Sequence, residues 1–89
     1  MISLEKIKYI LRLEDIEGYI EYHGAPENEY DSEAVSLEQE LLKQPALTEE
    51  IILEILKSVW AQSFNLDDAD IQKRISHLQN VARVLKTHI

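Results

Sequence analysis

Hydrophobic residues recur at helical spacing along most of the chain. From Ser3 to Leu13, apolar side chains return every three or four positions, which is the period that places them on one face of an α-helix. Ser3 can accept a hydrogen bond from an amide of the first turn, as N-cap residues do. The pattern therefore predicts a first helix over about residues 3–13. Its apolar face would consist of Leu4, Ile7, Ile10 and Leu11.

Three longer helices are predicted further along the chain. The first, over about residues 32–43, ends before Pro45, which cannot continue a helix. The second, over about 48–64, has Thr48 as its N-cap and the widest apolar face, so we expect it at the centre of the core. The third, over about 67–87, begins with carboxylates and continues with basic side chains, as the helix dipole favours. The faces expected to be buried are Ala34, Val35, Leu37, Leu41 and Leu42; Ile51, Ile52, Ile55, Leu56, Val59, Trp60 and Phe64; and Ile71, Ile75, Leu78, Val81, Ala82 and Leu85.

The connection between the first two predicted helices is less regular. Asp15 is placed to cap a short helical turn, and Gly24 supplies a natural stop for it. A short strand with the sequence GYIEYHG is the competing interpretation. We expect Asp31 or Ser32 to cap the helix that follows. A connection of this length usually has a function or contains structure of its own.

Together these elements predict an all-α fold, a small antiparallel bundle of three main helices with an N-terminal helix and a partly helical connection. The chain of 89 residues is expected to form one domain, residues 1–89. Only two glycines and two prolines interrupt it, which favours helices over a multi-turn β fold. No run approaches the roughly 20 apolar residues that span a bilayer, and the N-terminus lacks the apolar core of a signal peptide. We therefore predict a cytoplasmic protein with no membrane contact.

Acidic residues are concentrated in one third of the chain. The formal net charge is −8, and residues 13–42 hold ten acidic side chains and no Lys or Arg. Such a band repels phosphate groups, so we do not expect nucleic acid as a partner. It would attract a basic protein and speed the encounter with it. The simpler interpretation is a solvated surface that keeps a small protein soluble.

Three tyrosines of the acidic band lie off any strong apolar stripe. Exposed tyrosines are typical of contact surfaces, although these could equally pack the connection onto the bundle. We predict a candidate interaction surface within residues 14–33 for a basic protein partner. Its residues are Glu17, Tyr19, Glu21, Tyr22, His23, Glu27, Glu29, Tyr30, Asp31 and Glu33.

No catalytic or metal-binding motif is recognisable. The chain has no Cys and only three His, none of which pairs with another at helical spacing. A calcium loop starting at Glu27 would place Ser32 where a Gly is needed and Glu38 inside a helix. We therefore predict neither enzymatic activity nor a cofactor. Two alternatives stay open: a small enzyme or a ligand- or metal-binding domain with a site around His23, Glu27 and Asp31, and a homo-oligomeric structural module.

Three stretches of the chain, EDIEGYI, GAPENEYDSEA and EILKSVWAQSF, resemble the YugE-like family of small bacterial proteins of unknown function. The resemblance covers roughly residues 10–64 and is most specific in GAPENEYDSEA. Asn28 stands where the family has its first acid, and Ile16 stands where a Pro is expected. The resemblance implies a compact helical domain and brings no activity or catalytic residue with it. The layout is also similar to that of small immunity-type proteins, which are acidic and helical.

Overall fold

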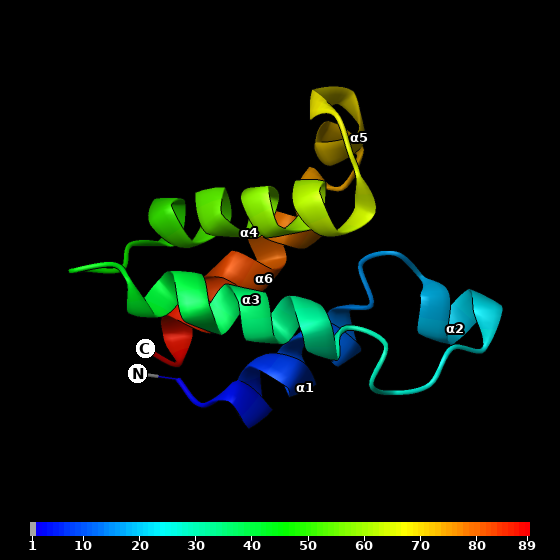
Figure 1. Ribbon diagram of the computed structural model, residues 1–89, viewed down its shortest axis with the longest axis horizontal. Coiled ribbons are helices and arrows are strands. Elements are labelled where there is room, and N and C mark those ends of the chain that lie inside the picture. Colours follow the sequence, from blue (N-terminus) through cyan, green and yellow to red (C-terminus); the bar gives the residue numbers. More distant parts are fainter. Residues whose placement is uncertain (1) are drawn as a thin grey trace.

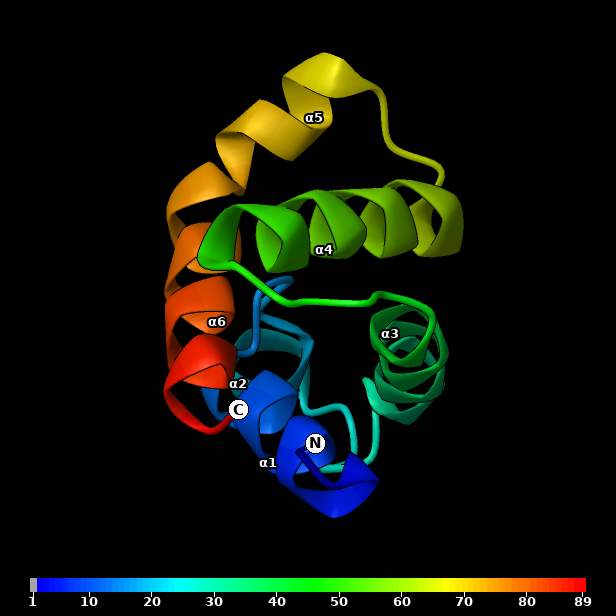
Figure 2. The same ribbon diagram turned by 90° about the vertical axis from the view of Figure 1, so that its left-hand side faces the viewer.

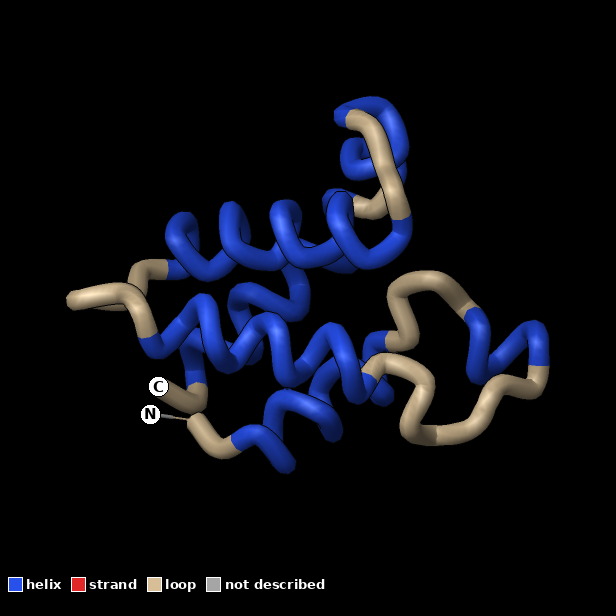
Figure 3. Tube along the Cα trace, in the orientation of Figure 1, coloured by secondary structure: helices blue, strands red, loops and turns tan. Residues whose placement is uncertain are grey.

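Residues 2–89 are described by a computed structural model, and every regular element among them is a helix (Figures 1 and 3). The predicted all-α class is confirmed. No helix in this part of the chain is both long enough and apolar enough to cross a membrane. The helices are α1 (Leu4–Glu14), α2 (Tyr19–His23), α3 (Asp31–Leu42), α4 (Glu49–Phe64), α5 (Asp68–Lys73) and α6 (Ile75–Thr87).

Side-chain caps confirm three of the predicted helix starts. The hydroxyls of Ser3 and Thr48 each accept a hydrogen bond at 3.2 Å from the amide three residues later. At the start of α5, Asp67 and Asp70 form a reciprocal capping box, in which each side chain accepts from the other's amide. These caps satisfy amides that have no partner within the helix, and they fix where α1, α4 and α5 begin.

The helix α3 departs from its predicted cap and its predicted face. Tyr30 occupies the N-cap position and no side chain caps the helix, so the expected cap at Asp31 or Ser32 is wrong. Val35 and Leu42, which were expected on the buried face, are 38% and 62% exposed. The helix α3 therefore carries more apolar residues than the face that packs against the core can bury.

A break at Arg74 divides the helix predicted over residues 67–87 into α5 and α6, so the prediction of one continuous helix is wrong. In an unbroken helix the amide of Arg74 would donate to the carbonyl oxygen of Asp70. That amide donates to the oxygen of Ile71 instead, at 2.9 Å. The Nη1 atom of Arg74 takes over the Asp70 oxygen at 2.8 Å. The side chain thus replaces the backbone donor, and the helix changes direction there (Figure 2).

The four longest helices enclose one hydrophobic core. The helix α4 packs against α3 and α6, and α1 closes the ring through contacts with those same two helices. Leu56 and Trp60 of α4 and Leu78 of α6 are fully buried, which confirms the expected central position of α4. Figure 2 views α3 along its axis while α4 crosses the view and α6 runs down it. The predicted antiparallel layout is therefore not confirmed.

The connection between α1 and α3 projects from one end of this core (Figures 1 and 3). We call it the α2 lobe and define it as residues 15–30. Residues Tyr19–His23 form the predicted short helix, and the competing strand is wrong. Gly24 ends α2 with a φ of 65°, a left-handed conformation that glycine adopts without strain.

Candidate functional site

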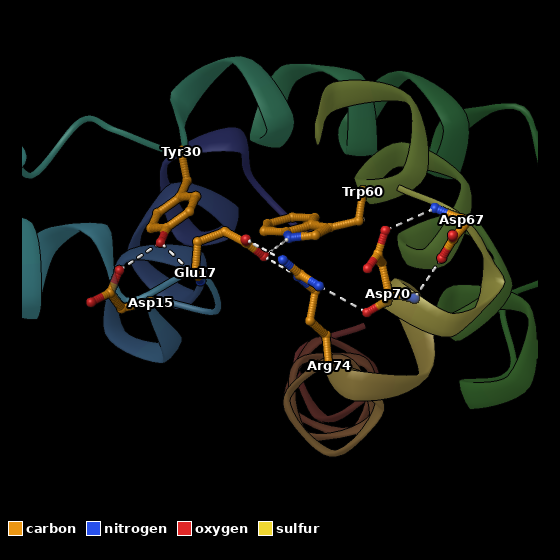
Figure 4. Close-up of polar contacts among 7 residues, drawn as sticks. All are labelled: Asp15, Glu17, Tyr30, Trp60, Asp67, Asp70 and Arg74. Carbon is orange, nitrogen blue, oxygen red and sulfur yellow. Dashed lines mark hydrogen bonds and ion pairs between the residues drawn. The ribbon is translucent and has the colours of Figure 1, made fainter. Parts of the chain in front are cut away.

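A polar network fastens the α2 lobe to the core (Figure 4). Asp15 follows α1 with a φ of 46°, which is uncommon for a residue with a side chain. Its carboxylate accepts hydrogen bonds from the amides of Ile20 and Glu21 at 3.2 and 3.0 Å. Asp15 thereby satisfies the first turn of α2, as predicted, although Gly18 occupies the N-cap position itself.

Tyr30 returns the chain to the core at the other end of the lobe. Its hydroxyl donates to Oδ1 of Asp15 at 2.6 Å and accepts from the amide of Glu17 at 3.1 Å. Its ring stacks on those of Tyr19 and Trp60, with centroid distances of 6.4 and 5.9 Å. The residue is only 2% exposed. One side chain thus connects the beginning and the end of the lobe to each other and to the core.

Glu17 joins the lobe to the junction of α5 and α6. Its two carboxylate oxygens accept from Nε and Nη2 of Arg74 at 2.6 and 2.8 Å, the two-pronged geometry that suits a guanidinium. The indole Nε1 of Trp60 donates to the same carboxylate at 2.9 Å. The side chain of Glu17 is 5% exposed and that of Arg74 is 24% exposed. Because a charge withdrawn from water is costly without a partner, these three side chains depend on one another.

Hydrogen bonding controls the ionisation of these groups. Burial alone would raise the pKa of Glu17, but the hydrogen bonds from Arg74 and Trp60 and the charge of Arg74 outweigh it, so the pKa lies below its usual value of 4.5. Burial likewise disfavours the Asp15 carboxylate, yet the hydrogen bonds from Tyr30 and two amides lower its pKa. Burial and the Asp15 carboxylate both raise the pKa of Tyr30. At neutral pH both acids are therefore ionised and Tyr30 is a neutral donor.

Part of the predicted interaction surface faces the interior. Glu17 and Tyr30 belong to the network just described. Glu33 is 7% exposed, and its carboxylate accepts a hydrogen bond from the hydroxyl of Ser32 at 2.8 Å. Tyr19 is half-buried, with its ring against that of Tyr30. Glu17 and Tyr30 thus fasten the lobe to the core, Glu33 is buried beside Ser32, and, contrary to the expectation from the sequence, none of the three is accessible to a partner.

The remaining predicted residues form the outer face of the lobe. Tyr22 is 76% exposed, more than any other large hydrophobic side chain in residues 2–89. Its ring lies over Gly18, where an added Cβ would come within 2.9 Å of a ring carbon, and Gly18 also has a φ of 72°. A side chain at position 18 would therefore disturb both the backbone and the position of Tyr22. The other exposed members are Glu21, His23, Glu27 and Glu29, with Asp31 partly exposed at the start of α3.

Of the three residues of the alternative ligand site, Glu27 and Asp31 line one pocket, and His23 is not part of its lining. Glu27 pairs with Arg12 at 3.4 Å, and Asp31 lies 3.8 Å from Lys8. His23 shares no hydrogen bond with Glu27 or Asp31 and lies at the end of α2. Among residues 2–89, no group of three side chains is arranged to hold a metal ion.

Five of the ten acids of the band contact a basic side chain. Of its ten acids, Glu17, Glu27, Asp31 and Glu40 contact a Lys or Arg, and Glu14 contacts His77 at 2.7 Å. Glu21 and Glu29 have no ion pair with any described basic group. Glu21, next to Tyr22 in α2, and Glu29 are thus exposed carboxylates of the lobe without a basic partner.

Sequence reasoning found only part of the anchor. It expected Asp15 to cap α2 and allowed Tyr30 to pack the connection onto the bundle. It missed the contacts of Glu17 with Trp60 and Arg74. Trp60 was expected in the core, where it lies, but its N–H also requires an acceptor when buried. This need for an acceptor is the signal that the sequence offers for the anchor, but it does not identify the acid that supplies the acceptor. Arg74 is 57 positions from Glu17 along the chain, and neither residue has a neighbour that indicates the pair.

Comparisons of the chain with models of protein families, with curated proteins and with solved structures find no match. Membership of the YugE-like family stays a prediction.

Proposed function

We propose that the protein is a non-catalytic interaction module that docks a basic protein partner on the outer face of the α2 lobe. The observation that supports this proposal is the position of Tyr22. Its ring is 76% exposed, although the lobe that carries it is fastened to the core by the contacts of Asp15, Glu17 and Tyr30.

The anchoring matters because docking normally orders the surface that is bound. Immobilising a loop and its side chains on association opposes binding by roughly 0.5–1.5 kcal/mol for each flexible side chain. In this protein the lobe is already ordered by the hydrogen bonds to Asp15 and Glu17 and by the stacking of Tyr30 on Trp60. A tyrosine on such a support offers a large contact area at low entropic cost.

The charge of the outer face defines the partner. Glu21 precedes Tyr22, and Glu29 is a further exposed acid of the lobe. Neither has a described basic group in contact, so they favour a partner that presents Lys or Arg. An immunity- or antitoxin-like protein in the cytoplasm, covering the basic cleft of a nuclease, is one concrete form of this function. The resemblance of the sequence to the YugE-like family is compatible with this role, because that family has no known function.

A photo-crosslinking residue at position 22 tests the proposal directly. In cells that produce the protein, we expect a crosslink from position 22 to a protein with a basic surface. The matched control is position 89, because Ile89 is 43% exposed after α6 and lies outside the lobe. Equal capture from both positions, or crosslinks only to a second copy of the chain, would contradict the proposal.

The affinity of the captured partner then tests the residues. We expect Tyr22→Ala and Glu21→Lys each to weaken binding at least about tenfold, as the loss of an interface anchor does. Added salt should weaken it as well, since charge attraction between exposed groups is screened. Glu38→Lys on α3 is the control for net charge. If it weakens binding as much as Glu21→Lys, the lobe is not the docking surface.

A further inference from the structure

A groove between α3 and α4 lies toward the end of the molecule opposite the α2 lobe (Figure 1). Its volume is about 400 Å³. The apolar side chains that line it are Ile51 and Ile55, which follow one row along α4 and are both half-buried. Both residues belong to the face of α4 that was expected to be buried in the core. The groove thus leaves part of that face open to solvent.

Carboxylates flank the two isoleucines on both sides of the groove. Glu50 and Glu54 lie on the adjacent row of α4, and Glu40 lines the groove from α3. No basic residue is part of the lining. Glu40 contacts Lys43 at 2.9 Å, and Glu54 contacts Lys57 at 3.3 Å. Such exposed ion pairs are weak. The rim therefore keeps a negative potential around an apolar strip.

The neighbouring cleft between α4 and α6 lacks this combination of an apolar strip and a purely acidic rim. Glu49 and Glu50 also line that cleft, but Arg83 lies among them. Its lining thus contains both signs of charge, and it lacks the single-sign rim of the α3–α4 groove.

We propose that the α3–α4 groove binds a short amphipathic helix with basic flanks, supplied by a protein partner. An amphipathic helix in a groove buries apolar side chains at every third or fourth position, and Ile51 and Ile55 have this spacing. Lysines or arginines beside its apolar stripe would meet Glu40, Glu50 and Glu54. The row from Glu50 to Ser58 extends over about 12 Å at 1.5 Å per residue, which matches roughly two turns of a docked helix. This inference does not depend on the role of the α2 lobe.

A synthetic peptide of Leu and Lys with helical periodicity, blocked at both ends, is the probe. Titration calorimetry measures its affinity, and NMR of the isoleucine methyl groups locates it. We expect saturable binding with the largest shifts at Ile51 and Ile55. A peptide of the same composition with its Leu and Lys positions scrambled, so that it has no apolar face, is expected to bind at least tenfold more weakly.

Two matched double variants separate the groove from general charge attraction. Glu50→Lys with Glu54→Lys reverses the rim, whereas Glu21→Lys with Glu29→Lys makes the same change in net charge on the α2 lobe. All four positions are exposed, and thermal melting of both variants checks that they fold. We expect the first variant to lose at least tenfold in affinity for the peptide and the second to stay within twofold of the wild type.

Several outcomes would overturn the proposal. Equal loss in the two double variants, or equal binding of the scrambled peptide, would show attraction to the overall charge rather than to the groove. Absence of binding would also refute it. Shifts of the Ile51 and Ile55 methyl groups that depend on protein concentration without peptide would assign the groove to a second copy of the chain. Tyr22→Ala should leave the affinity for the peptide unchanged. A negative result for the groove therefore leaves the proposal for the α2 lobe untouched.

Discussion

The α4–α6 part of the core and the α2 lobe are stabilised by different kinds of contact. Leu56 of α4 and Leu78 and Leu85 of α6 are aliphatic and fully buried, whereas α2 has no buried residue at all. Apolar burial is non-directional and grows with area. Only Ile16 and Tyr30 of the lobe are buried, and the lobe relies mainly on a few directional hydrogen bonds between charged or polar groups. We therefore expect the stability of the core to fall when a buried side chain is shortened. The attachment of the lobe should weaken when a single hydrogen-bonding atom is removed.

The largest expected effect is in the core. Leu78→Ala removes a fully buried side chain and leaves a cavity, which typically lowers the free energy of unfolding by about 3 kcal/mol. Urea unfolding followed by circular dichroism measures this loss. Hydrogen exchange should show that amides of the core and of the lobe lose protection together. Loss of protection confined to α6 would show that the helices do not unfold as one unit.

A smaller loss is expected when Glu17→Gln removes the charge opposite Arg74. Arg74 is then left partly buried without its carboxylate, so we expect the free energy of unfolding to fall by about 2 kcal/mol. Glu54→Gln is the control, because its pair with Lys57 is exposed and contributes little. Similar losses in the two variants would show that the network at Glu17 has no special weight.

The same variant should change how stability depends on pH. The pKa of Glu17 is lowered in the folded protein, so the unfolded chain binds the proton first and stability falls with decreasing pH. The contribution is complete above the ordinary value of 4.5 and is lost as the pH drops through the folded pKa. Glu17→Gln should therefore lose less stability than the wild type between neutral and acid pH. Parallel pH profiles of the two proteins would contradict this assignment.

The smallest and most local effect is expected from Tyr30→Phe. The ring and its stacking on Trp60 remain, but Asp15 loses a donor at 2.6 Å and the amide of Glu17 loses its acceptor. We expect a loss of about 1 kcal/mol. Hydrogen exchange of the Ile20 and Glu21 amides should accelerate, while the core amides of α4 keep their protection. Equal acceleration in both regions would remove the distinction between core and lobe.

Most of the helical framework follows from the sequence because it rests on periodic apolar residues and local caps. The helices α1 and α4 begin beside the predicted caps Ser3 and Thr48, and Trp60 lies in the core as expected. The break at Arg74 was missed because no Gly or Pro marks it. It results from a side chain that bonds both to its own turn and to a distant carboxylate, and local patterns do not contain that information.

The candidate site was predictable only in part, because charge density does not determine burial. Tyr22, Glu21 and Glu29 are exposed as expected. Glu17 and Tyr30 gave no specific sign of burial in the sequence. Glu17 is buried because distant residues supply its donors, and Tyr30 is buried with its ring stacked on Trp60. A carboxylate can leave water when two or three donors replace its solvation, and those donors lie 43 and 57 positions away, in Trp60 and Arg74.

The bond between Glu17 and Arg74 also sets an order of events during protein synthesis. Translation proceeds from the N-terminus at about 5–20 residues per second, so the residues of the lobe are joined seconds before Arg74 is. Until residues 60–74 have emerged, Glu17 lacks both its guanidinium and its indole donor. The face of the lobe that carries Tyr22 therefore takes its final form only after Arg74 has been added, and a shorter nascent chain does not present it in that form.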